Sequence, residues 1–295
     1  MRRWWQWPPY PASHPARQLL GINLVGDADD RPLMVHHGRM QAQHEAGSAT
    51  PDTAAHRGRR VTSFRSRRSS LSEAYQQVWE RLWPQLGRQA LPADGEPVER
   101  IDAPAWFGRR APHGLVCEIG CGTGTSTLAM AQAEPDIDVV AVEVYRRGLA
   151  QLLNGIDRTG VANIRLVRGD GVDVLEHLFG PESLTGVRVF FPDPWPKSRH
   201  HKRRLLQPST LALIADRLRP GGVLHAATDH PGYAEQIAEA GDGEPRLRRA
   251  QPGELGTPPV SGGLPISVQR PATKYETKAR AAGSAVTELI WVRRP

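Results

Sequence analysis

Apolar and polar residues follow two different periods along this chain. From residue 115 onward, short apolar runs alternate with stretches in which apolar residues recur every three to four positions. The apolar runs predict strands at 115–119, 138–144, 164–168, 187–191, 223–227 and 286–292. The intervening stretches predict helices at 125–133, 145–156, 172–179, 208–218 and 232–239. Because strands that are apolar on both faces must be covered on both sides, the pattern predicts an α/β fold with a mostly parallel central sheet and helices on both faces.

The region before this alternation has a different pattern. Residues 1–58 are rich in Pro, Gly, His and Ala without sustained periodicity, which predicts a disordered basic tail. A function of this tail and a start codon assigned too far upstream are the two alternatives. Residues 71–86 have helical spacing with Ser72 as N-cap. Residues 87–112 predict a connector, and residues 241–265 a long loop. The chain therefore divides into three parts: the tail over 1–58, an arm, helix and connector over 59–112, and the main domain over 113–295.

Composition limits the class of protein. With 295 residues, 39% of them hydrophobic, the chain can bury one sizeable core. The sequence contains no run of about 18 apolar residues, so no membrane-spanning helix is predicted. The two cysteines, Cys117 and Cys121, give no disulfide framework and fit a cytoplasmic protein; we expect them to be buried and assign them no metal. The net charge of +7 comes mainly from residues 1–70, which hold 11 Arg against 5 acids. A nucleic-acid partner must therefore be indicated by a local basic cluster.

A glycine-rich turn follows the first predicted strand. Gly120, Gly122 and Gly124 allow a sharp turn and the close approach of a ligand before the next helix. Their G-x-G-x-G spacing differs from the G-x-G-x-x-G of dinucleotide-binding enzymes. Glu118, two residues before the first glycine, would repel a pyrophosphate but suits the cationic methionine end of S-adenosylmethionine. The alternative is a tight strand–helix turn with no ligand.

Two further acids end the next strands. Glu143 closes the second strand, where it can accept hydrogen bonds from ribose hydroxyls, and Asp170 follows the third, where it can receive an adenine amino group. The carboxyl ends of parallel strands meet at one rim of the sheet, so we expect both acids near the glycine turn.

The fourth strand ends in the segment F-F-P-D-P-W, which delivers Asp193 to the same rim. Pro192 and Pro194 stiffen this turn, and Trp195 offers a flat face on which a base can stack. Five basic residues follow within eight positions, with two histidines among them: Lys197, Arg199, His200, His201, Lys202, Arg203 and Arg204. This cluster is the footprint that a phosphate backbone requires, although a solvated basic face is the alternative. The histidines have no carboxylate or thiol partner at ligand spacing, so no metal is predicted.

Lysine is confined to two short segments. The chain has 34 Arg but only four Lys, at 197, 202, 274 and 278, which suggests that these positions require an ammonium group. In the second segment, the stretch R-P-A-T-K-Y-E over 270–276 offers Thr273, Lys274 and Glu276 as polar contacts, or forms an ordinary turn. Asp229 ends the fifth strand and joins the same rim.

These motifs together resemble the bacterial tRNA (guanine-N7)-methyltransferase family, TrmB, over about residues 60–292. The F-F-P-D-P-W segment followed by R-H-H-K-R-R is specific, whereas the glycine turn is common to class I methyltransferases. The resemblance implies a Rossmann-like class I methyltransferase fold, S-adenosyl-L-methionine as cofactor and Asp193 as the catalytic residue. It implies cofactor binding by Glu118, Gly120, Gly122, Gly124, Glu143, Asp170 and Asp193. It implies substrate binding by Lys197, Asp229, Thr273, Lys274, Tyr275 and Glu276, and RNA contacts by residues 199–204.

The implied reaction is methylation of N7 of a guanine in the tRNA variable loop, at position 46, with tRNA as the partner and no membrane or obligate protein partner. Tyr275, where a Phe is common, and Lys278-Ala279, where some members have Arg-Gly, depart from the family pattern and affect the details of the recognition loop. Other possibilities are a class I methyltransferase with a non-RNA substrate, a non-catalytic RNA-binding protein on the same scaffold, and a nicotinamide oxidoreductase, which the glycine spacing disfavours.

Overall fold

The computed structural model describes residues 70–92, 98–111, 113–255, 263–272, 276 and 285–295. The chain divides into two units, Met1–Val61 and Thr62–Pro295, and every described residue belongs to the second. The predicted tail and the basic residues before position 69 lie outside the described residues.

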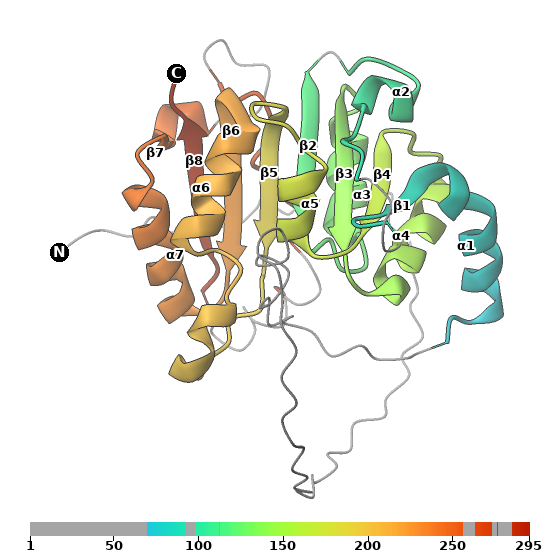
Figure 1. Ribbon diagram of the computed structural model, residues 1–295, viewed down its shortest axis with the longest axis horizontal. Coiled ribbons are helices and arrows are strands. Elements are labelled where there is room, and N and C mark those ends of the chain that lie inside the picture. The colour runs from blue at the N-terminus through green and yellow to red at the C-terminus, as the bar shows by residue number, and fades with distance from the viewer. Residues whose placement is uncertain (1–69, 93–97, 112, 256–262, 273–275, 277–284) are drawn as a thin grey trace, which may run out of the picture. The chain divides into compact units, whose positions relative to one another are not determined.

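Eight strands form one mixed sheet in the order β1-β4-β3-β2-β5-β6-β8-β7 (Figure 1). All neighbouring pairs from β1 to β6 are parallel, and β8 is antiparallel to both β6 and β7. The mostly parallel sheet predicted from the sequence is confirmed. The strands are β1 Gly87–Gln89, β2 Gly114–Ile119, β3 Ile137–Glu143, β4 Ile164–Arg168, β5 Leu184–Phe190, β6 Leu218–Thr228, β7 Leu247–Arg249 and β8 Thr287–Arg293.

Helices cover both faces of this sheet, as the apolar strands require. One hydrophobic cluster joins the sheet to Leu175, Ile214 and Ile237 of α5, α6 and α7, and the other joins it to Trp79 and Leu153 of α1 and α4. Figure 1 shows α5, α6 and α7 in front of the strands. The helices are α1 Glu73–Leu86, α2 Ala103–Phe107, α3 Thr125–Ala133, α4 Arg146–Thr159, α5 Gly171–His177, α6 Pro208–Arg217 and α7 Pro231–Gly243, with the short 3-10 helices η2 Ser198–Arg203 and η3 Pro252–Glu254.

Two predicted irregular regions contain regular structure. The connector predicted over 87–112 includes β1 and α2, and β1 pairs with β4 so that Gly87 lies opposite Leu166. The loop predicted over 241–265 includes the end of α7, β7 and η3. Both predictions were wrong for the same reason. β1 and β7 have three residues each, too few to show a period, and their structure comes from pairing with a longer strand.

None of the described helices has the length and apolar content needed to cross a membrane.

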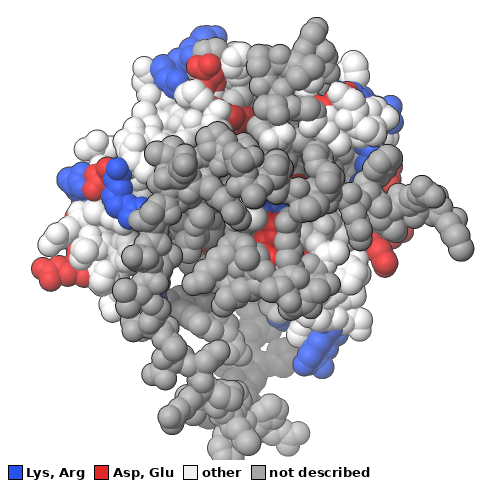
Figure 2. All heavy atoms as spheres, turned by 180° about the vertical axis from the view of Figure 1, so that it is seen from behind, with Lys and Arg blue, Asp and Glu red and all other residues white. Residues whose placement is uncertain are grey.

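On the described part of the face in Figure 2, Lys and Arg lie in small groups, several of them beside Asp or Glu. This mixture agrees with the near-balanced charge of residues beyond position 70.

Candidate active site

A cavity of about 310 Å³ opens at the carboxyl ends of β2, β3, β4 and β5. This is the rim at which an open α/β sheet binds its ligands. Among the residues expected to function, its described lining contains Gly120, Gly122, Glu143, Asp170, Asp193 and Arg203, together with Trp195. The glycine turn and the F-F-P-D-P-W segment therefore share one cavity.

The glycine turn has the backbone conformation that glycine favours. Gly120 and Gly122 have φ values of 78° and 56°, and a Cβ placed on either would meet no atom within 4 Å. The space in front of this turn is therefore open for a ligand. Gly124 has a different role: a Cβ there would lie 2.5 Å from Leu152 Cδ1, so this glycine permits close packing against α4.

Glu143 and Asp170 both line the cavity, and both also shape it. Glu143 accepts backbone hydrogen bonds from Gly122 at 3.0 Å, Val144 at 2.7 Å and Tyr145 at 3.1 Å, and so fastens the glycine turn to the end of β3. Asp170 caps α5 by accepting a bond from the Val172 amide at 2.8 Å. Their contacts with ribose and adenine remain predictions.

Glu118 lies beneath the turn, and its side chain is not part of the cavity's described lining. It is 3% exposed, and its Oε2 is buried without a hydrogen-bond partner among the described residues. Burial raises the pKa of this carboxyl group, and the charge of Arg188 and the Thr127 hydroxyl oppose that rise. A buried carboxylate oxygen without a donor costs free energy, so this position fits a ligand that carries a cationic donor.

The segment that carries Asp193 has an unusual backbone. Phe191 and Trp195, on either side of it, have φ values of 52° and 42°, a conformation that L residues seldom adopt. The Phe191 amide is held by a 2.8 Å hydrogen bond to the Ala227 carbonyl of β6. Burial raises the pKa of the Asp193 carboxyl group. Strained backbone of this kind is characteristic of functional sites because the surrounding structure must enforce it.

Basic and aromatic side chains lie next to Asp193. The guanidinium carbon of Arg203 lies 5.0 Å from the centre of the Trp195 ring, and the His200 ring meets the same indole edge-on at 5.6 Å. One face of Trp195 is therefore already occupied by a cation in this structure. Lys197, Arg199 and Lys202 are exposed, and none of the three lines the cavity.

Arg204 differs from the other members of the basic cluster, because it is only 3% exposed. Its Nε donates to the Pro194 carbonyl at 2.7 Å, and its Nη1 donates to Gln236 Oε1 at 2.6 Å. In this structure Arg204 is therefore bonded inside the protein, and its contact with RNA stays a prediction. From the sequence alone, a basic residue in a basic cluster is expected to be solvated. In the structure, the guanidinium of Arg204 is bonded to α7.

The second substrate segment is described only in part. Thr273, Lys274 and Tyr275 lie outside the described residues. Asp229 is exposed beyond β6 and is not in the described lining of the cavity. Glu276 is 1% exposed and pairs with Arg270 at 2.5 Å, so its carboxylate is bonded inside the protein. Substrate binding by these residues remains a prediction.

A buried polar network, which the sequence prediction missed, anchors Glu276. Arg270 also pairs with Glu288 at 3.0 Å, and Glu288 Oε2 lies 2.6 Å from His225 Nε2. The Arg270 guanidinium lies 4.9 Å from the centre of the Phe191 ring. The network thus links β6, β8 and the segment before Asp193. The sequence feature that could have revealed this network is a charged or polar residue inside an apolar strand, such as His225.

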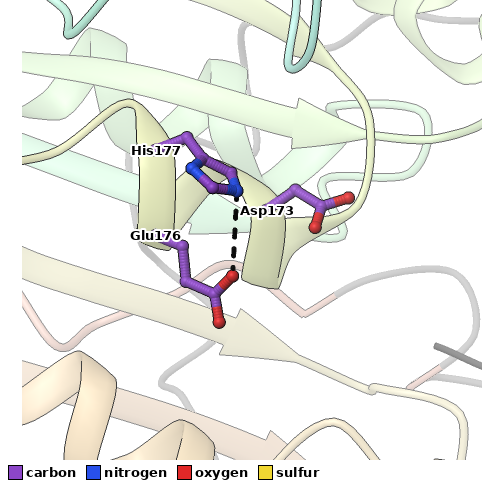
Figure 3. A group of neighbouring side chains, drawn as sticks. All are labelled: Asp173, Glu176 and His177. Carbon is purple, nitrogen blue, oxygen red and sulfur yellow. Dashed lines mark ion pairs between the residues drawn. The ribbon is translucent and has the colours of Figure 1, made fainter. Parts of the chain in front are cut away.

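One group of side chains among the described residues has the spacing of metal ligands. Asp173, Glu176 and His177 of α5 place one ligand atom each within 4.8 Å of one another (Figure 3). The glutamate and histidine side chains are 38% and 46% exposed and lie 3.9 Å apart, on a seven-residue helix. Asp173 is partly buried and the other two groups are largely exposed, and three such groups on one short helix do not by themselves define a metal centre.

Fold and cavity define a methyltransferase of the Rossmann-like class, and comparison with known proteins narrows the class. Residues 112–289 match the sequence profile of a family described as "Putative methyltransferase". A tRNA (guanine-N(7)-)-methyltransferase of Mycolicibacterium gilvum is 66% identical over 277 residues, covering 89% of this chain and 100% of the relative. The Mycobacterium tuberculosis H37Ra protein of the same name is 64% identical over 264 residues, covering 88% of this chain and 95% of the relative. This chain belongs to the tRNA (guanine-N7)-methyltransferase family.

Solved structures resemble the chain more distantly. The 16S rRNA methyltransferase KamB is 18% identical, with a TM-score of 0.44 over 66% of this chain and 95% of its own. An rRNA methylase from Streptococcus thermophilus is 14% identical, with a TM-score of 0.39 over 62% of this chain and 87% of its own.

Proposed function

We propose that this chain transfers a methyl group from S-adenosyl-L-methionine to N7 of a guanine in tRNA, at position 46 of the variable loop. The observation that carries the proposal is the shared cavity, in which the glycine turn and Asp193 face the same space with Trp195 and Arg203 beside it. The 66% identity to a relative named for this activity supports the same reaction.

The residues present fit S-adenosyl-L-methionine. The unpaired buried oxygen of Glu118 suits the ammonium of the methionine end, and the open space at Gly120 and Gly122 admits a ligand close to the backbone. Glu143 and Asp170 would hold the ribose and the adenine. When bound, the cofactor supplies an electrophilic methyl group on a sulfonium.

Guanine N7 carries a lone pair and no proton, so the reaction requires no strong general base. The protein must align N7 with the methyl group and stabilise the positive charge that develops on the ring. Asp193 suits this task because a carboxylate can accept hydrogen bonds from donors on the guanine edge and offset that charge. Lys197, Asp229 and residues 273–276 would complete the substrate site.

The exposed cations beside Asp193 would hold the tRNA backbone. Lys202 and Arg199 are exposed, and Arg203 reaches the cavity next to Trp195. Phosphate contacts of this kind position a nucleic acid without reading its sequence. The choice of guanine would then depend on the cavity and on residues 273–276. We place the activity in the cytoplasm and expect it to need no protein partner.

The direct test uses the purified chain, labelled cofactor and unmodified tRNA, followed by nucleoside analysis. We expect 7-methylguanosine in wild-type tRNA and none in tRNA with adenine at position 46. Label at another guanine would correct the position, and tRNA binding without transfer would instead support a non-catalytic RNA-binding protein. Activity of the chain alone would also establish that no partner is required.

A further inference from the structure

The guanidinium of Arg204 connects two parts of the fold that lie far apart in sequence. Its Nε bond to the Pro194 carbonyl is 2.7 Å long, and its Nη1 bond to Gln236 Oε1 is 2.6 Å long. Pro194 follows Asp193 directly, and Gln236 belongs to α7. The two bonds leave from different nitrogens, which is the fork geometry that arginine provides and lysine does not.

The aromatic ring beneath this guanidinium is also fixed. The Arg204 guanidinium carbon lies 4.8 Å from the centre of the Tyr233 ring, and Tyr233 is 0% exposed. The Tyr233 hydroxyl accepts a 2.9 Å bond from the Leu206 amide. The cation therefore rests on a buried ring of α7 that is itself bonded to the backbone at Leu206.

The segment around Asp193 has few backbone hydrogen-bond donors with which to stabilise its own conformation. Pro192 and Pro194 have no N–H to donate, and the residues on either side of this Pro-Asp-Pro stretch, Phe191 and Trp195, have left-handed backbone angles. Such a conformation persists only when surrounding groups impose it. The bond to the Pro194 carbonyl fixes the peptide between Pro194 and the strained Trp195, one residue beyond Asp193.

We propose that Arg204 is a positioning residue, which acts through Pro194 to hold the Asp193 carboxylate at the cavity. This inference deepens the proposed function and rests on it. An arginine that contacts phosphate would have to leave a site where it is 3% exposed and break both bonds. The exposed Arg199 and Lys202 can contact RNA without such a change.

The neighbouring Arg203 is the matched control, because it has the same charge but reaches the cavity and the Trp195 ring. We expect Arg204→Met to lower kcat about 10- to 100-fold, the loss that misplacing a reacting group causes. Dissociation constants for tRNA and S-adenosylhomocysteine should change less than about twofold, and Arg204→Lys should recover only part of the rate. Arg203→Met should instead weaken tRNA binding. A weaker tRNA affinity for Arg204→Met at unchanged kcat would overturn the proposal.

Combination with Asp193→Asn tests whether Arg204 acts through that residue. Groups that act as one unit show non-additive effects on rate. We expect Asp193→Asn/Arg204→Met to be about as slow as Asp193→Asn alone. A further 10-fold loss in the double variant would mean that Arg204 acts by another route.

Hydrogen exchange provides a readout that does not depend on activity. In Arg204→Met, the amides of Trp195, Lys197 and Ser198 should exchange faster, whereas Lys202→Met, at an exposed side chain, should leave them unchanged. If Arg204→Met does not fold, Gln236→Leu removes one of the two bonds and should show the same effect to a smaller degree. If wild-type protein does not methylate tRNA but exchange rises as described, the proposed function fails while the positioning role stands. Unchanged exchange together with unchanged kcat would refute the positioning role.

Discussion

Glu118 and Arg188 occupy paired positions on the adjacent parallel strands β2 and β5, directly below the glycine turn. Both are buried, at 3% and 0% exposure. The arginine also donates to Glu134 at 2.5 Å and to the Ser267 carbonyl at 3.2 Å. A single buried cation on β5 therefore bonds the Glu134 carboxylate at the end of α3 and lies beside the Glu118 carboxylate on β2.

Arg188→Met should destabilise the protein by about 3–5 kcal/mol, because removing one partner leaves buried carboxylates without their cation. Urea denaturation measures the change. Arg81→Met is the control: its 2.7 Å pair with Asp157 is 55% exposed on the arginine side, and its loss should have little effect. If the two substitutions lowered the free energy of unfolding equally, burial of the ion pair would not account for the effect of Arg188→Met.

Asp193→Asn should raise thermal stability near neutral pH while abolishing most methyl transfer. Asp193 is exposed, and partial desolvation raises the pKa of its carboxyl group, so the folded state favours the protonated form only to a small extent. The contribution of this group to stability is complete below the unfolded pKa and is lost as pH rises through the folded pKa. The difference in melting temperature should therefore vanish in acid. A stability gain that persists below about pH 3, well under the usual Asp pKa, would have another cause.

The acid limb of the pH–rate profile should report the same carboxyl group. If the ionised form of Asp193 supports transfer, the rate falls as the pH drops through its raised pKa, above the usual range for Asp. Asp193→Asn should lose this limb along with most of its rate. An unchanged limb in the residual activity of that variant would assign the titration to another group.

Gly148→Ala should weaken binding of S-adenosylhomocysteine by about 10-fold or more, because it displaces the glycine turn that approaches the ligand. A Cβ at Gly148 would lie 2.3 Å from the Gly122 carbonyl oxygen, a backbone atom that cannot move aside without shifting the turn. Gly155→Ala on the same helix is the control, since its Cβ would meet the Leu128 side chain at 3.0 Å. Titration calorimetry compares the two variants, and equal affinities would refute the prediction.

Arg199→Gln and Lys202→Gln should weaken tRNA binding with little effect on binding of S-adenosylhomocysteine. Both side chains are exposed and belong to η2, the short helix that also carries the cavity residue Arg203. Removing one cation that neutralises a phosphate should reduce the salt slope of log K by about 0.7–0.9. An unchanged slope in the double variant would mean that these cations form a solvated face.

The long elements could be predicted from the sequence, because their burial leaves a period that can be counted. The helix predicted at 125–133 and the strand at 164–168 match α3 and β4. The rim acids were predictable for a related reason, since Glu143 and Asp170 each follow a recognisable strand. Parallel strands bring their carboxyl ends together wherever the intervening helices lie.

Features that depend on a distant partner could not be predicted in this way. Arg204 has the same local sequence context as Arg203, and only α7, about thirty residues later, separates their roles. Glu276 was placed near the substrate by motif, but its pairing with Arg270, which also pairs with Glu288, depends on the position of β8. Spacing along the chain carries no information about such partners.

One of the two three-residue strands of the sheet, β1, determines how far the chain can be trimmed. β1 covers the outer edge of β4, and Ala90 continues the pairing with a 3.0 Å bond to the Arg168 carbonyl. A protein cut at residue 112, where the family profile begins, would keep every acid of the rim but expose a row of unpaired amides and carbonyls along β4. Open edges of this kind recruit strands from other molecules. The smallest fragment that stays monomeric should therefore begin upstream of Gly87.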